Sequence, residues 1–386
     1  MQSYSIINYR KILADIIVPA KGRVGRRASL HDLRGAVEQD MLIDAAVRER
    51  VAPMLYRCLL DTGQLALLQR RQRETLQRHY HRNVLTNIKC LHALGALLER
   101  TGAFGIDVVL LQGAALMSDV YRADVGLRPL SDIDLWVAAN QLPMLTRALR
   151  DLGYRRDALY ATHFSKGPVT LDVRTDLMWA DRIAARRFLM DAGEQAGVLQ
   201  RARTVSVEGR AVRRLDPWDE VLYLCLHLLK HYADRLIWLV DILKLTTLWQ
   251  DEDWRTLCRR AHYLGHVKAM RVVFLLADRL FASHLSERGG GAAVVRFNFM
   301  DRRLLAMWGR DARLPEWSPL VFLAPSKGSV AYGRYVWENL FPRRSVLQQV
   351  FDAEDDGRPW RLYGLRLKQL GLKALRSLHP GKGFRR

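Results

Sequence analysis

The chain has 386 residues, 49% of them hydrophobic, with a formal net charge of +21 and a pI near 10.2. This length allows two or three domains with at least one full hydrophobic core, and no apolar run approaches the roughly 20 residues that a membrane span needs. The charge favours an anionic partner such as a nucleotide, a nucleic acid or an anionic lipid surface, although a coding bias toward arginine would explain it equally well.

The cysteines and the N-terminal residues bear on the compartment. Cys58, Cys90, Cys225 and Cys258 lie far apart and form no Cys-x-x-Cys pair. We therefore expect reduced thiols inside helices rather than a structural zinc site. The N-terminal segment lacks the small-residue cleavage pattern of a signal peptide. These features favour a cytoplasmic protein without a transmembrane segment.

Residues 1–103 are predicted to form an N-terminal helical region. Ser29 is a candidate helix N-cap, and apolar residues at helical spacing lead up to Gly63. A long amphipathic helix then ends near Gly102. Its middle is rich in arginine and histidine, which could bind nucleic acid, but such a run is more often a solvated helix face.

At residue 104 the hydrophobic period becomes strand-like, and an α/β core is predicted over residues 104–215. A buried strand at 106–111 leads into Gly113 and a helix running to about 122, whose first N–H groups could stabilise an anion. A second strand follows at 131–137, with helices at 141–152 and 181–190. Two hairpins are expected, one over 154–177 turning at 166–168 and one over 203–215 turning at 208–210.

The second of these strands carries two acids in Ser131-Asp132-Ile133-Asp134-Leu135. Because side chains alternate along a strand, Asp132 and Asp134 share one face, about 6.6 Å apart along the strand. They could hold one divalent ion or two neighbouring ions, the usual device for phosphoryl transfer, although an isolated Asp-x-Asp more often caps a turn.

A third carboxylate is expected on the strand that begins at Val169. Asp172 and Asp176 both lie on one alternating face of that strand. Asp172 is favoured, because Leu171 and Val173 flank it as in a buried strand. The alternative is a surface-facing acid on an edge strand.

Residues 216–288 are predicted to form a helical bundle that begins with an Asp216 N-cap and Pro217. His227, Lys230 and His231 lie near one another on one helix, without the glutamate of the zincin motif, so that motif is rejected. Asp241 stands among apolar residues and should therefore have a cationic partner.

Residues 289–386 form a predicted basic, mostly helical C-terminal extension. Gly289-Gly290-Gly291 is the clearest linker in the chain. Trp360–Leu378 can form a basic amphipathic helix. It could rest on RNA, an acidic partner or an anionic surface, or it could pack on its own protein, which is the more common outcome.

Taken together, these segments resemble a bacterial family of stand-alone, largely uncharacterised nucleotidyltransferases in the DNA polymerase β-like superfamily. The resemblance spans roughly residues 35–285 and is most specific in the string from Gly126 to Leu135, Gly-Leu-Arg-Pro-Leu-Ser-Asp-Ile-Asp-Leu. It also rests on residues 110–115, 171–173, 226–231 and 238–241. It implies an α+β fold, in which a small mixed β-sheet core is flanked by N-terminal helices and a C-terminal helical bundle.

The resemblance also implies a reaction, the transfer of a nucleoside monophosphate from a triphosphate such as ATP to a hydroxyl acceptor. The acceptor would be a sugar, a peptide or protein, or RNA. Asp132 and Asp134 would bind two Mg²⁺ (or Mn²⁺) ions and Asp172 the catalytic one. The expected nucleotide-binding residues are Gln112, Gly113, Ala114, Arg128 and Ser131, with Arg128 as a bidentate phosphate donor. Candidate cleft residues are Arg174, His227, Lys230, His231 and Asp241.

Three positions depart from the family pattern. Ala114 stands where serine is usual, Gln112 where lysine is more frequent, and Arg174 where histidine is often found. All three acids remain, which favours an active enzyme. The alternative is a catalytically inactive nucleotide- or peptide-binding accessory protein with the same fold, and Gln112 and Ala114 favour it.

Overall fold

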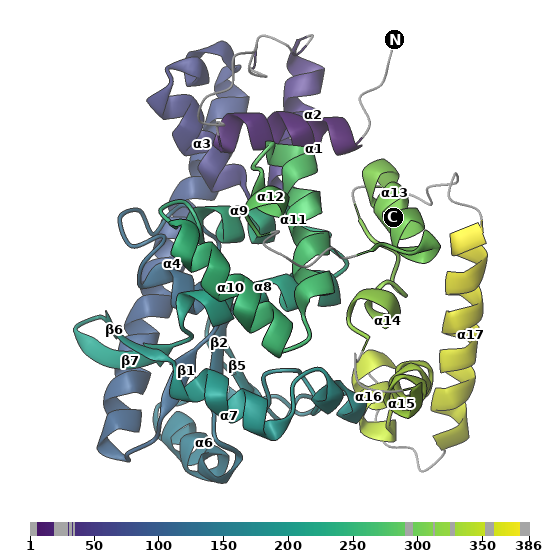
Figure 1. Ribbon diagram of the computed structural model, residues 1–386. Coiled ribbons are helices and arrows are strands. Elements are labelled where there is room, and N and C mark those ends of the chain that lie inside the picture. Colours follow the sequence, from purple (N-terminus) through teal and green to yellow (C-terminus); the bar gives the residue numbers. More distant parts are fainter. Residues whose placement is uncertain are drawn as a thin grey trace.

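The computed structural model describes residues 6–18, 30, 33, 35–289, 296–311, 313–324, 329–351 and 359–378. Figure 1 shows the N-terminal helices above a β-sheet, with the C-terminal helices beside them. The predicted cap at Ser29 and most of the predicted linker, Gly290 and Gly291, lie outside the described residues. The predicted α+β class is confirmed: a mixed sheet is preceded and followed in the sequence by helices.

The N-terminal region is helical as predicted. Its helices are α1 (Ile6–Ile17), α2 (Ala36–Arg48), α3 (Ala52–Asp61), a short 3-10 turn (Gln64–Leu67) and α4 (Arg70–Ala103). A buried ion pair fixes α1 in place, with Arg10 Nε 2.6 Å from Glu49 Oε1. Arg10 also donates to the carbonyl of Ala233, and Glu49 accepts the backbone N–H of Leu236. This pair therefore joins the N-terminal helices to the bundle.

A seven-stranded mixed sheet forms the centre, in the order β3-β4-β5-β2-β1-β7-β6. The strands are β1 (Val108–Leu110), β2 (Ile133–Val137), β3 (Arg155–Arg156), β4 (His163–Lys166), β5 (Val169–Arg174), β6 (Arg203–Val207) and β7 (Arg210–Arg214). β2 pairs parallel with β5, and β1 pairs parallel with β7, whereas the other pairs are antiparallel. Ile133, Leu135 and Val137 are buried in the core, as their alternation predicted.

Shorter helices connect these strands: α5 (Gln112–Met117), α6 (Leu142–Asp151) and α7 (Ala192–Gln200). Two predicted helices are wrong in extent. The helix expected to reach residue 122 ends at Met117, because the chain turns there and buries Tyr121. The helix expected over 181–190 is only a 3-10 turn, Ala184–Phe188.

Both predicted hairpins are present, but the first predicted strand of the 154–177 hairpin is interrupted. Arg155–Arg156 and His163–Lys166 are separate strands. Between them, the Asp157 carboxylate accepts the backbone N–H groups of Leu159 and Tyr160 and closes a turn. The side chain thus competes with strand pairing at this point.

The bundle contains α8 (Pro217–Lys230), α9 (Leu236–Leu245), α10 (Asp251–Tyr263), α11 (Val267–Phe281) and α12 (Leu285–Arg288). The predicted N-cap is confirmed, since Asp216 accepts the backbone N–H of Trp218. Nearly all of α8 is buried between its neighbours. The end of α8 and the start of α9 lie beside the part of β2 and β5 that carries the predicted site.

The C-terminal extension is helical, with α13 (Phe299–Asp311), α14 (Pro319–Phe322), α15 (Ser329–Leu340), α16 (Arg344–Phe351) and α17 (Pro359–Leu378). The amphipathic helix predicted at 360–378 is α17, which runs along the outside in Figure 1. It contacts the protein through the buried Leu362 and through Arg366, which donates to the carbonyl of Leu340. Among the described helices, none is long and apolar enough to cross a membrane.

Candidate active site

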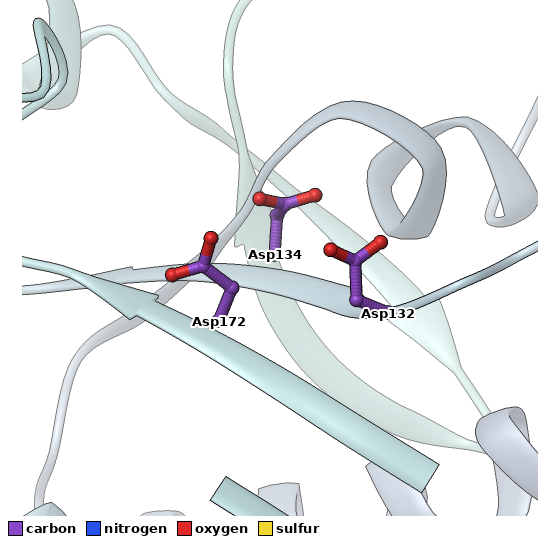
Figure 2. A group of neighbouring side chains, drawn as sticks. All are labelled: Asp132, Asp134 and Asp172. Carbon is purple, nitrogen blue, oxygen red and sulfur yellow. The ribbon is translucent and has the colours of Figure 1, made fainter. Parts of the chain in front are cut away.

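The pairing of β2 with β5 brings the three predicted acids together. Asp134 lies directly opposite Asp172 in the parallel register, and Asp132 immediately precedes β2. One carboxylate oxygen from each of the three lies within 4.8 Å of the others. Figure 2 shows all three carboxylates on the same side of the strands. Asp176 is turned elsewhere, because it accepts the N–H groups of Met178 and Ala180.

Two basic side chains neutralise part of this acidic cluster. Arg174, two residues beyond Asp172 on the same face, donates from Nη2 to Asp172 and, at 2.9 Å, to Asp134 Oδ1. His163 pairs with Asp172 across β4 and β5, with Nε2 3.3 Å from Oδ1. Both oxygens of Asp172 are therefore engaged, whereas Oδ2 of Asp132 and of Asp134 accepts no hydrogen bond within the described part of the chain.

Burial and charge act differently on the two paired acids. Burial raises the pKa of Asp134 to about 6, against the opposing charge of Arg174. Burial would also raise the pKa of Asp172, but the hydrogen bond from His163 and the charge of Arg174 outweigh it, so this pKa is lowered. Of these two acids, Asp134 is thus the one whose negative charge is less compensated.

The cluster fits a hard divalent cation. Carboxylate oxygens are the ligands that Mg²⁺ and Mn²⁺ prefer, and the triad supplies three acids against one arginine and one histidine. Asp132 and Asp134 each keep an oxygen for such an ion. Asp172 would have to exchange one of its present partners. The donor set is suitable, and Arg174 is the side chain with which a metal ion would compete.

The loop before β2 is anchored by a second ion pair, between Arg128 and Asp241. Arg128 donates through Nε and Nη2 to both carboxylate oxygens at 2.9–3.1 Å, and Tyr121 adds a 2.7 Å hydrogen bond to Oδ1. The predicted cationic partner of Asp241 is therefore Arg128. Because this edge of the guanidinium is occupied, only Nη1 is left to face a phosphate, and one of its N–H groups donates to the carbonyl of Pro129 at 3.4 Å. Phosphate binding by Arg128 stays a prediction.

Gly113 is required by the position of Arg128. A Cβ atom at Gly113 would lie 2.8 Å from Arg128 Cζ and 2.9 Å from Leu130 Cδ2, and closer still to Arg128 Nη1. The preceding residue, Gln112, adopts a left-handed backbone with φ of 50°. Because Gly113 has no Cβ atom, the start of α5 can lie directly against the Arg128 side chain.

Two asparagines of α4 bind the backbone of the same loop, the one before β2. Asn87 donates to the carbonyls of Val125 and Arg128 and accepts the N–H of Leu130, and Asn83 donates to the carbonyl of Gly126. Gly126 has to be glycine here, since a Cβ would lie 2.6 Å from Val84 Cγ2. Sequence analysis missed this role, although two asparagines on the buried face of a long helix are a usable signal.

The triad forms one wall of a cavity of about 340 Å³. Most predicted site residues line it: Gln112, Gly113, Arg128, Ser131, Asp132, Asp134, Asp172, Arg174, His227, Lys230 and His231. Ala114 is buried inside α5, and Asp241 lies behind Arg128. Three further cations, Arg50, Arg182 and Arg235, also line the cavity and were missed, because single arginines carry little signal in an arginine-rich chain.

Most of the chain matches one known protein family. Residues 35–282, more than half of the chain, match the sequence model of a family described as uncharacterised nucleotidyltransferase. The chain belongs to this nucleotidyltransferase family. A solution structure of the antibiotic-resistance factor ANT(2'')-Ia also matches, at 15% identity and a TM-score of 0.33, over 46% of this chain and 95% of that one. A search among curated proteins gave no match.

The end of α8 contributes a group of buried basic side chains. Burial, together with the charges of His231 and Lys230, lowers the pKa of His227 well below its usual value, and burial lowers that of His231 to about 2. Burial and the charges of Arg174 and Arg186 lower the pKa of Lys230. The Lys230 ammonium lies 4.4 Å from the centre of the Trp179 ring. Burial therefore favours the uncharged forms of these basic side chains, which line the cavity together with Trp238 of α9.

Proposed function

We propose that the protein transfers a nucleoside monophosphate from a nucleoside triphosphate to a hydroxyl acceptor, using Mg²⁺ or Mn²⁺ held by Asp132, Asp134 and Asp172. The observation that carries this proposal is the convergence of three carboxylates within 4.8 Å at the edge of a basic cavity. Three acids placed this closely, two of them buried, are costly to the fold unless a cation is bound.

The basic side chains around Asp132 suit the triphosphate. Arg50 lies close enough to Arg235, Arg128 and Asp132 for their charges to act on it. Arg50 has a left-handed backbone, with φ of 60°, at the break between α2 and α3. In the described part of the chain Arg50 forms no ion pair, so its charge is available to phosphate oxygens. Gly113, Ser131 and Nη1 of Arg128 would complete the phosphate contacts.

The reaction joins the acceptor oxygen to the α-phosphorus and breaks the bond from that phosphorus to the bridging β-phosphate oxygen. Pyrophosphate leaves, and the hydroxyl proton passes to water. When bound, the divalent cation would supply positive charge to the α-phosphate and to the departing pyrophosphate. The chain itself would position the phosphates with arginine side chains, and Trp238 of α9, which lines the cavity, would help to exclude water.

The test incubates the protein with each α-labelled nucleoside triphosphate, Mg²⁺ or Mn²⁺, and sugar, peptide and RNA acceptors in turn. Label transfer and pyrophosphate release should be lost in Asp132→Asn and Asp134→Asn. Asp151→Asn, which changes an exposed carboxylate on α6, is the matched control and should keep full activity. Transfer that persists in both triad variants would refute the assignment.

A second candidate is a binding protein that no longer turns over substrate. Arg174 bridges Asp134 and Asp172, as an internal cation that could replace a metal ion. Gln112 lacks the charge of the lysine that is frequent in the resembled family. Nucleotide binding without any metal requirement, together with no pyrophosphate release, would favour this candidate.

The basic face of α17 suggests an additional contact with RNA or an anionic surface. Lys368 is exposed on this helix. Lys368→Glu should weaken binding of a single-stranded RNA at low salt, and the dependence of log affinity on log salt should become shallower by about 1. Equal binding by the variant and the wild-type protein would limit α17 to a packing role.

A further inference from the structure

A second cavity, of about 750 Å³, lies next to the triad cavity. It is bounded by the end of α8, by the segment around Arg186 and by helices of the C-terminal extension, which flank the rest of the protein in Figure 1. Its walls are largely apolar, with contributions from Tyr232, Leu314, Trp317, Leu320, Leu340 and Val346. This volume is within the range of small-molecule sites in proteins.

The two cavities meet at three basic side chains. Arg182, Lys230 and His231 line both of them. Lys230 is also close enough to Asp172 and Asp134 for their charges to act on it. A molecule lying in the second cavity with one end at Lys230 would therefore have that end beside the triad.

The junction carries the positive charge of Arg182, and an anion bound there would favour the charged form of Lys230 against the burial that lowers the pKa of Lys230. Arg182 lies 5.9 Å from the centre of the Tyr160 ring, and Lys230 packs on Trp179, but neither forms an ion pair with a carboxylate in the described ranges. Elsewhere in the second cavity, Glu316 is 3.8 Å from Arg313. The apolar walls thus end at two basic side chains that have no carboxylate partner among the described residues, which is complementary to an apolar molecule with an anionic end.

The rest of the cavity argues against very polar occupants. A sugar without an apolar part would make few favourable contacts with these walls, because they offer its hydroxyl groups few hydrogen-bond partners. Of the other cations here, Arg366 is engaged by the carbonyls of Leu340 and Asn339 and by Gln369, and Arg313 faces Glu316. Arg186 lies close enough to Lys230 for its charge to act at the junction. The available charge is therefore concentrated at the junction.

We infer that the second cavity is the acceptor site and that it takes an acceptor with an apolar chain, a hydroxyl group and an anionic group next to that hydroxyl. This inference rests on the proposed function. The apolar chain of the acceptor lies along α14–α16. Its anionic group contacts Arg182 and Lys230, and its hydroxyl group reaches the triad. The triphosphate occupies the opposite side, near Arg50 and Arg235.

The apolar lining comes mainly from residues beyond 282, where the match to the nucleotidyltransferase family ends. The triad, by contrast, lies inside the matched segment. Acceptor choice would thus be a property of this chain's own C-terminal extension. This division makes the two halves of the site separately testable.

The probe is 3-hydroxydodecanoate, which combines the three features, and its binding to the full-length protein is measured by calorimetry. Two matched ligands remove one feature each: 3-hydroxybutanoate lacks the apolar chain, and the methyl ester of the probe lacks the charge. We expect the probe to bind at least tenfold more tightly than either one. Failure of the probe to bind, or equal binding of all three, would overturn the inference.

Cavity-filling variants locate the binding. Leu320→Trp and Leu340→Trp place a larger side chain in the cavity from two different helices, and Val330→Trp adds the same side chain at an exposed position on α15. We expect the first two to lose probe binding at least tenfold while keeping nucleotide binding, and Val330→Trp to resemble the wild-type protein. Unchanged probe binding in either folded filling variant would overturn the inference.

The proposed function is judged by a separate readout. Incubation with α-labelled triphosphate should give a labelled probe in the wild-type protein. Probe binding that is lost in the filling variants, without any transfer to any acceptor, would leave the apolar anion site in place but remove its role as an acceptor site. Transfer to another acceptor without binding of the probe would keep the proposed function and reject the acceptor class.

Discussion

Replacing Asp241 by alanine should remove a large part of the free energy of unfolding. Asp241 is 0% exposed, and Arg128, which donates three contacts of 2.9–3.1 Å to it, is only 7% exposed. Removing one partner leaves a buried charge without compensation, at a cost of about 3–5 kcal/mol. A protein is typically stable by about 5–15 kcal/mol, so this change alone would bring the fold near its limit.

Urea denaturation followed by circular dichroism measures this effect. A matched control removes Glu74, whose pair with Arg70 is of similar length, 2.7 Å, but lies on the exposed surface of α4, and it should leave the midpoint unchanged. The double variant Arg128→Met with Asp241→Leu should recover part of the loss, because no buried charge then remains. A loss below about 1 kcal/mol in Asp241→Ala would refute the reasoning.

Three further outcomes follow from the site. Because burial raises the pKa of Asp134 to about 6 from an ordinary 3.8, the folded protein keeps a proton that the unfolded chain releases, so its stability should fall as pH rises from 4 to 6. The contribution of Asp134 is up to about 3 kcal/mol, since two pH units are involved, and Asp134→Asn should make the slope of the urea midpoint against pH less steep; an unchanged slope would contradict this. Arg174→Gln should raise Mn²⁺ affinity at least tenfold in calorimetry, because it removes the cation that engages Asp134 and Asp172; weaker Mn²⁺ binding would show instead that Arg174 orders the triad. Gly113→Ala should destabilise the fold by about 1–3 kcal/mol, because its Cβ would collide with Arg128, whereas Gly102→Ala, which meets no atom within 4 Å, should not; equal midpoints would contradict the packing.

Local pattern was enough to predict the acidic face of β2. The alternation around Asp132 and Asp134 is a property of one strand, and so is the setting of Asp172 between two apolar residues. The hairpin turns and the Asp216 cap were likewise predicted from neighbouring residues. What sequence could not give was the strand register, in which Asp134 lies opposite Asp172 and Asp172 lies opposite His163.

Distant partners account for most of what was missed. The prediction that Asp241 needs a cation was correct, but nothing local indicates that the cation is Arg128, which lies 113 residues earlier in the chain. Nothing local in the sequence indicates that Arg50 and Arg182 line the cavity either. They reach it from the break between α2 and α3 and from a loop, respectively. The interrupted strand after Arg156 has a local cause, the Asp157 turn, that strand periodicity alone did not reveal.

The position of β1 in the middle of the sheet has a consequence for biosynthesis. β1 is flanked by β2, which follows soon after it, and by β7, in which Arg213 pairs with Val109. During translation, one hydrogen-bonding edge of the apolar Val108–Leu110 strand therefore has no partner until about a hundred further residues have been made. Unpaired edges of this kind promote association between chains. We expect nascent chains that stop before residue 210 to be retained by chaperones or to aggregate, and chains that include β7 to escape this fate.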